Sequence, residues 1–183
     1  MARALRAPRP PLPRFAVAWF PAFEGLDRIE AFRRRHDPQA GAIAAHLTLV
    51  FPFSTALSAL QVETHVRKVV SAWPPVAVAF KPVRGLNNEF VLLMATRGAA
   101  AVSQLHDKLY TRSIRPHLRR DLPYEPHITI ARQPEPARYE AALADAEAQF
   151  HGEFSSVLRE VTLLSLRAEG KIERLKDLPL DSR

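Results

Sequence analysis

The sequence predicts a mixed fold of helices and strands that is built from two related halves. Segments with the period-two pattern of strands alternate with segments that carry the period of amphipathic helices. The length of 183 residues fits one compact domain, or two small lobes that share a core. A four-residue pattern of histidine, apolar, threonine, apolar occurs once in each half of the chain, as an internal repeat would.

The first part of the chain predicts two strands and two helices. Four prolines disfavour helix in residues 1–13, which we interpret as a flexible leader. Ser58 opens the second helix, and Gln61 three residues later completes the pattern of a capping box. The elements expected before Pro74-Pro75 are a strand over 14–20, a helix over 23–35, a buried strand over 43–51 and a helix from Ser58 to the double proline.

The remainder of the chain adds strands and two further helices. A turn around 85–88 should join the first two strands as a hairpin, and Pro116 should end the helix that follows. We expect no linker between independent domains. The expected elements are strands over 76–83 and 89–95, a helix over 99–115, a basic loop over 117–126, a strand over 127–132, a helix over 136–149, and strands over 154–158, 161–166 and 172–178.

Composition excludes several classes of site. The chain has no cysteine, which rules out disulfides, a thiolate nucleophile and a cysteine-based zinc site and suits a cytoplasmic protein. No Gly-rich phosphate loop is present, and no apolar run is long enough to cross a membrane. The basic N-terminus lacks the apolar region of a secretory signal. A formal net charge of +7 and a pI near 10.4 favour polyanionic partners such as nucleic acid.

The repeated pattern stands at His46-Leu47-Thr48-Leu49 and at His127-Ile128-Thr129-Ile130. In a strand, residues two apart point to the same face, so each histidine shares a face with its threonine while the apolar pair points to the core. If the two strands lie side by side about a pseudo-two-fold axis, one cleft holds two imidazoles and two hydroxyls.

Such a cleft suits phosphodiester chemistry without a metal. Near neutral pH one imidazole can accept a proton from the attacking oxygen while the other, protonated, gives one to the leaving oxygen. The threonine hydroxyls can donate to the phosphate oxygens. A catalytic zinc site needs three protein ligands, and no third ligand is evident. We expect the other histidines to be surface or capping residues: His36, His65, His106, His117 and His151.

These two motifs resemble the paired motifs of the 2H phosphoesterase superfamily, which includes bacterial 2′-5′ RNA ligase-like proteins and cyclic phosphodiesterases. The resemblance also covers Phe20-Pro21, the segment RRRHDP at 33–38, HLTLVFPF at 46–53 and PHITIAR at 126–132. Ala45 departs from it, because many relatives have proline before the first histidine, and this predicts a looser entry into the strand.

The resemblance implies an α+β fold with two pseudo-symmetric lobes, in which antiparallel sheets face a central cleft and helices lie outside. Residues 14–183 would then form a single bilobal domain. The catalytic residues implied are His46, Thr48, His127 and Thr129. In hydrolysis His127 would be the base that acts on water and His46 the acid that acts on the leaving oxygen, although the two roles could be reversed.

Three further residues are candidates for substrate binding. Arg132 could contact phosphate or form a structural salt bridge, and Phe51, like Phe53, could wall the cleft or pack in the core. Tyr124 could stack on a base or cap the edge of the core. The basic loop could meet RNA phosphates or simply be solvated; its arginines are Arg115, Arg119 and Arg120.

We therefore expect an enzyme that opens 2′,3′-cyclic phosphates or cleaves 2′-5′ linkages, with RNA-end joining as the same chemistry reversed. One alternative is a non-catalytic module that binds nucleotides or RNA in the same cleft. Another is an esterase of a small metabolite, such as a cyclic ADP-ribose phosphate, which differs from the first expectation only in specificity. The expected partners are RNA ends or a small nucleotide with a cyclic phosphate. We expect no metal, no cofactor, no membrane association and a monomeric, cytoplasmic protein.

Overall fold

The computed structural model describes residues 11–181, so the first ten residues of the expected leader lie outside the described residues. The strands are β1 (Arg14–Trp19), β2 (Leu47–Ser54), β3 (Val76–Leu86), β4 (Phe90–Ala95), β5 (His127–Arg132), β6 (Phe154–Leu158), β7 (Glu160–Leu166) and β8 (Ile172–Pro179). The helices are α1 (Leu26–His36), α2 (Ala59–Val70), α3 (Ala99–Leu109) and α4 (Pro136–Gln149), with 3-10 turns η1 (Arg112–His117) and η2 (Ala168–Gly170). In the described part of the chain, no helix is both long and apolar enough to cross a membrane.

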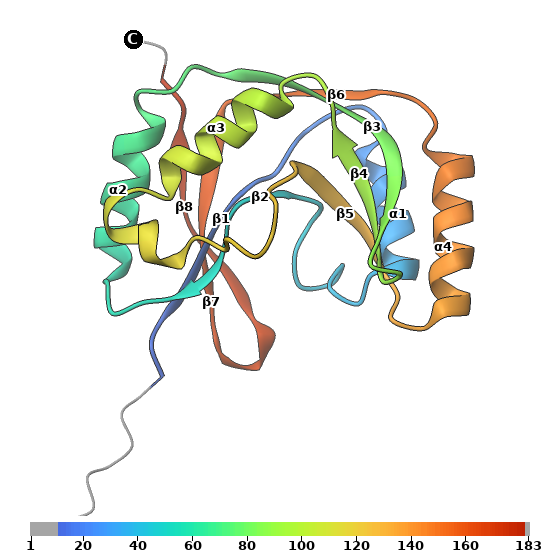
Figure 1. Ribbon diagram of the computed structural model, residues 1–183, viewed down its shortest axis with the longest axis horizontal. Helices are drawn as coiled ribbons and strands as arrows, with labels where there is room; N and C mark the ends of the chain where they lie inside the picture. The colour runs from blue at the N-terminus through green and yellow to red at the C-terminus, as the bar shows by residue number, and fades with distance from the viewer. Residues whose placement is uncertain (1–10, 182–183) are drawn as a thin grey trace, which may run out of the picture.

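The strands form one bent antiparallel sheet in the order β6-β3-β4-β5-β2-β1-β7-β8. Its two four-stranded halves meet at the central strands β2 and β5, which are paired at a single position, Leu47 with Ile128. Helices α2 and α3 cover one half, and α1 and α4 cover the other (Figure 1). The predicted α+β fold with two lobes and outer helices is confirmed, and the two sheets are halves of one continuous sheet.

The main core lies between the outer face of the sheet and the helices. The apolar residues of both repeated motifs, Leu47 and Leu49 on β2 and Ile128 and Ile130 on β5, are fully buried there. Each helix contributes the apolar stripe that its period predicts. The fully buried helix residues include Ile29, Phe32, Val62, Val66, Val102 and Leu105. The opposite, concave face carries the polar residues of both motifs together with apolar residues such as Ala18 and Leu92.

Two local predictions are confirmed at the ends of elements. The Ser58 hydroxyl accepts from the Gln61 backbone N–H at 3.3 Å, and the Gln61 side chain accepts from the Ser58 N–H at 2.9 Å, which completes the capping box of α2. The hairpin between β3 and β4 turns at Asn87 and Asn88, with φ values of 54° and 53°. Asparagine tolerates this left-handed conformation better than most residues do, which explains the tight turn.

Several predicted boundaries were wrong. Helix α1 begins at Leu26 and not at residue 23, because Gly25 before it adopts φ 87°. Strand β2 spans Leu47–Ser54, whereas we predicted 43–51. Helix α3 ends at Leu109 and not at residue 115, because the backbone leaves the helical region at Tyr110. Pro116 lies inside η1 and therefore does not end α3.

Candidate active site

A cavity of about 510 Å³ lies on the concave face, at the junction of the two halves of the sheet. Both repeated motifs contribute to its wall: His46 and Thr48 at the start of β2, and His127 and Thr129 on β5. All four side chains are half-buried, whereas the apolar residues between them are buried in the core. The alternation of strand side chains thus places the polar face of each motif in one shared cavity.

The pairing of β2 with β5 explains how the two motifs come together. Leu47 and Ile128 occupy the same position of the repeat and are directly paired. In antiparallel register, this pair puts His46 across from Thr129 and Thr48 across from His127. The pseudo-two-fold axis therefore passes between the two paired apolar residues, and each histidine lies opposite the threonine of the other motif along the strands.

Both imidazoles are oriented by the same kind of hydrogen bond. His46 Nδ1 lies 2.9 Å from the carbonyl oxygen of Ala44, and His127 Nδ1 lies 2.6 Å from the carbonyl oxygen of Glu125. A carbonyl only accepts, so each Nδ1 carries the proton, and in a neutral ring the lone pair is on Nε2. Each Nε2 is therefore the atom that can take up or release a proton.

Burial lowers the pKa of both histidines from the ordinary value of 6.5. For His46 the bond to the Ala44 carbonyl opposes this effect, the charge of Arg33 adds to it and that of Asp37 opposes it. For His127 the bond to the Glu125 carbonyl opposes the effect of burial, and the charge of Arg84 adds to it. Each imidazole is consequently neutral over more of the pH range than a free histidine.

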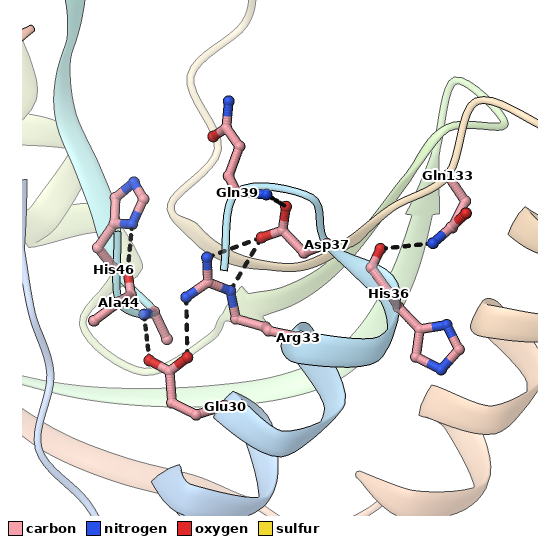
Figure 2. A network of polar contacts seen from close by, with 9 residues as sticks. Glu30, Arg33, His36, Asp37, Gln39, Ala44, His46 and Gln133 are labelled. Atoms are coloured by element: carbon pink, nitrogen blue, oxygen red, sulfur yellow. Dashed lines mark hydrogen bonds and ion pairs between the residues drawn. The ribbon is translucent and has the colours of Figure 1, made fainter. Parts of the chain in front are cut away.

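A buried polar network from α1 supports the strand entry at His46 (Figure 2). The Glu30 carboxylate accepts from the Ala45 backbone N–H at 2.5 Å and from Arg33 at 3.2 Å. Arg33 also donates two hydrogen bonds to one oxygen of Asp37, at 3.1 and 2.8 Å. A proline at position 45 would have no N–H to donate. The looser entry predicted from Ala45 is therefore wrong, because this N–H ties the residue before His46 to α1.

Two histidines expected at the surface are buried instead. His65 on α2 is 9% exposed and its Nε2 contacts the Leu109 carbonyl at 2.9 Å; His106 on α3 is 2% exposed. His106 Nδ1 donates to the Leu49 carbonyl at 2.7 Å, and its ring stacks on Tyr124 at 3.6 Å between centroids. The expectation was wrong because a helical histidine on the inner face can satisfy its nitrogens with carbonyls of neighbouring elements.

The three predicted binding residues all line the cavity, in different ways. Arg132 donates to Glu89 at 2.6 Å and lies over the Phe90 ring, so the salt bridge that we considered is present. Phe51 is half-buried on the wall, whereas Phe53 is buried in the core. The arginines of the basic loop, Arg115, Arg119 and Arg120, are exposed and do not contribute to the cavity wall.

Tyr124 is fixed by its own contacts. Its hydroxyl donates to the Thr48 carbonyl at 2.9 Å, and His106 covers one face of its ring. Burial raises the pKa of Tyr124, so its hydroxyl stays protonated and remains a donor. The ring thus anchors the loop before β5 against β2 and holds the two motifs close together.

Sequence reasoning missed four polar residues of the wall: Arg33, Asp37, Gln39 and Asn87. Two of them lie in the segment RRRHDP, which carried part of the family resemblance. Arg33 and Asp37 are four residues apart, the spacing of an ion pair within a helix, so the sequence could have predicted their contact with each other. Nothing in the pattern indicated that the helix end would reach the cavity.

Comparison with known proteins adds family evidence to this geometry. The family model for the 2′-5′ RNA ligase superfamily matches residues 21–169. A predicted phosphoesterase of Bacillus licheniformis is 27% identical over 124 residues, which cover 66% of this chain and 71% of that protein. A predicted phosphoesterase of Oceanobacillus iheyensis is 24% identical over 170 residues, covering 89% of this chain and 87% of that protein.

Solved structures show the same fold at low sequence identity. Escherichia coli LigT, in complex with 3′-AMP, aligns with a TM-score of 0.60 and 22% identity over 93% of this chain and 99% of that one. A protein of Thermus thermophilus, TT0787, aligns with a TM-score of 0.65 and 17% identity, with the same two coverages. The family model spans most of the chain, and both motifs fall within it. The chain therefore belongs to the 2′-5′ RNA ligase superfamily.

Proposed function

We propose that this protein is a metal-independent phosphoesterase that opens 2′,3′-cyclic phosphates or cleaves 2′-5′ phosphodiester bonds of RNA ends or nucleotides. The observation that carries the proposal is the pair of matched His-x-Thr motifs in one cavity. In both motifs the histidine Nδ1 is bound to the carbonyl two residues earlier. Each Nε2 is therefore available for proton transfer, as acid–base catalysis requires. Family membership supports the same reaction class.

The proposed hydrolysis uses the two imidazoles in opposite protonation states. Neutral His127 takes a proton from water, the water oxygen attacks phosphorus, and protonated His46 gives its Nε2 proton to the ribose oxygen as the P–O bond breaks. Thr48 and Thr129 donate to the non-bridging oxygens as negative charge builds there. In ligation, the 5′-hydroxyl of a second RNA end would take the place of water. It would lose its proton to one imidazole and attack the cyclic phosphate, the 3′-oxygen would leave with a proton from the other imidazole, and a 2′-5′ bond would form.

A turnover screen of the purified protein tests this function directly. The substrates are nucleoside 2′,3′-cyclic phosphates, 2′-5′ dinucleotides and RNA that ends in a cyclic phosphate. We expect turnover of at least one of these classes. Tight binding of nucleotides without turnover of any class would instead support a binding module that uses the same cavity.

The plot of kcat/KM against pH should be bell-shaped, with its maximum below pH 6.5, the ordinary pKa of histidine. The base must be neutral, so kcat/KM rises with pH through the pKa of that imidazole; the acid must be protonated, so kcat/KM falls through the pKa of the other. Because burial lowers both pKa values, both limbs of kcat/KM should lie below pH 6.5. A bound phosphate anion stabilises imidazolium, so the alkaline limb of kcat should lie at higher pH. A kcat/KM profile that still rises above about pH 8 would contradict this assignment.

Activity should survive exhaustive chelation. Two imidazoles suffice for the proton transfers, and a catalytic zinc site uses three protein ligands. Among residues 11–181, no three His, Asp or Glu side chains come close enough together to hold a metal ion. Turnover would be measured before and after dialysis against EDTA. Loss of turnover that is restored by one added metal would require another mechanism.

A further inference from the structure

The cavity is unequal on the two sides of its pseudo-two-fold axis. On β1, Ala18 is paired with Thr48; on β4, Leu92 is paired with Thr129. Directly paired residues share a face of the sheet, so both neighbours lie beside a threonine of the candidate site. The residue beside Thr48 is therefore small and the residue beside Thr129 is large; both are 1% exposed, so the two sides of the cavity differ in the side chains that line them.

The residues of β1, β7 and β8 that line the cavity are apolar, and they are bordered on the same face by two polar residues, Thr162 paired with Ala18 and Arg174 paired with Leu164. Ala16, Ala18 and Leu164 form a buried cluster separate from the main core, and three half-buried side chains pack against it and reach the cavity. We call this surface the apolar floor, and its residues are Ala16, Ala18, Ile43, Leu164, Leu166 and Ile172. None of them carries a polar side-chain atom. The wall on the other side differs, because it includes Asn87 and the ion-paired Arg132.

The charges around the cavity are also balanced. Within residues 11–181, its wall contains two cationic side chains, Arg33 and Arg132, and both are ion-paired: Arg33 to Asp37 and Glu30, and Arg132 to Glu89. An RNA strand or a polyphosphate would need several free cations to neutralise its charge. A single phosphodiester carries one negative charge, which the two hydroxyls and one imidazolium at the centre can hold. The wall therefore favours a small substrate with one phosphate.

We propose that the apolar floor is the subsite for the nucleobase of a small cyclic nucleotide, and that it accepts purines and pyrimidines alike. The inference rests on the function proposed above. Neighbouring strands lie about 4.8 Å apart, so the floor begins one strand away from Thr48 and extends across β1, β7 and β8. A base attached through ribose to a phosphate at the centre can lie along it. Apolar contact buries the faces of the base without hydrogen bonds to its edge, so the floor does not distinguish one base from another.

The test compares Ile172→Asn with the matched variant Leu86→Asn. Both residues are apolar, both line the cavity and both lie at a hairpin end of a strand, but Leu86 is on the β4 side. Ile172→Asn should weaken binding of all four nucleoside 2′-monophosphates and raise KM for all four 2′,3′-cyclic phosphates by about 10-fold, the effect of losing one branched apolar contact. Binding of inorganic phosphate and kcat should stay within about 2-fold. Leu86→Asn should change neither by more than about 2-fold.

A second variant covers the case in which Ile172→Asn fails to fold. Leu166→Asn changes another half-buried residue of the apolar floor, which is paired with Ile172, so it should have the same selective effect on nucleotides. Equal losses for nucleotides and inorganic phosphate would overturn the subsite, as would a nucleotide loss in Leu86→Asn as large as that in Ile172→Asn. If KM differed by more than about 10-fold among the four bases, the proposal that the floor accepts all bases alike would be wrong. One well-placed pair of hydrogen bonds to a base produces that much discrimination. Selective loss of nucleotide binding in a protein without turnover would refute the enzyme and support the subsite.

Discussion

Replacement of His46 or His127 by alanine is expected to lower turnover by about 10²- to 10⁴-fold, the usual contribution of a general acid or base. Each variant removes the only Nε2 of its motif, while the Nδ1 bond of the other histidine is left intact. The double variant should lose less than the product of the two single losses, because the two groups act in one proton-transfer step. Turnover of the best cyclic phosphate from the screen is the measurement.

The control for this experiment is His151→Ala. His151 is exposed, lies outside the cavity wall and contacts the Ala148 carbonyl near the end of α4. It should leave turnover unchanged, and nucleotide affinity should fall only modestly in the two active-site variants. If both His46→Ala and His127→Ala kept full turnover of every substrate, the acid–base mechanism would be refuted.

Arg33→Met is expected to lower the free energy of unfolding by about 3–5 kcal/mol, the cost of removing one partner of a buried ion pair. Arg33 is 1% exposed and Asp37 is 8% exposed, so the carboxylate would stay buried without its cation. For a domain of this size, the loss corresponds to a fall in Tm of about 10 °C. Thermal unfolding followed by circular dichroism measures it.

Two comparison variants make this stability test specific. Arg67→Met breaks the Glu63–Arg67 pair on α2, which also has i,i+4 spacing but is exposed, and should cost no more than about 0.5 kcal/mol. Arg33→Met combined with Asp37→Leu removes both buried charges and should recover much of the loss. A fall in Tm for Arg33→Met no larger than that for Arg67→Met would show that the buried pair contributes little.

Local sequence patterns were enough to predict the elements and the two motifs. In His46-Leu47-Thr48-Leu49, a strand with one buried face must turn both leucines toward the core. His46 and Thr48 must then point to the opposite face, so the pattern predicts the direction of each side chain. The capping box at Ser58 and the turn at Asn87 and Asn88 depend on neighbouring residues alone. These features depend on interactions within a few residues of chain, so they can be predicted without knowledge of the fold.

Boundaries and polar contacts between distant segments could not be predicted in this way. Helix α3 ends at Leu109, and the hydroxyl of the next residue, Tyr110, accepts from the Phe51 N–H at 2.9 Å. His106 was misjudged because its partner is the Leu49 carbonyl, 57 positions away in the chain. In both cases the residue is held by a hydrogen bond to β2, which is distant in the sequence. The residues around Tyr110 or His106 do not show that this partner is present.

The sequence by itself determined that two imidazoles and two hydroxyls would face away from the core on two similar strands. Only the tertiary structure decided that these strands are neighbours, through the single pairing of Leu47 with Ile128, and that Ala18 beside one threonine and Leu92 beside the other make the cavity unequal. The reason is that side-chain alternation is a property of one strand, whereas strand order depends on the burial of apolar surface over the whole chain.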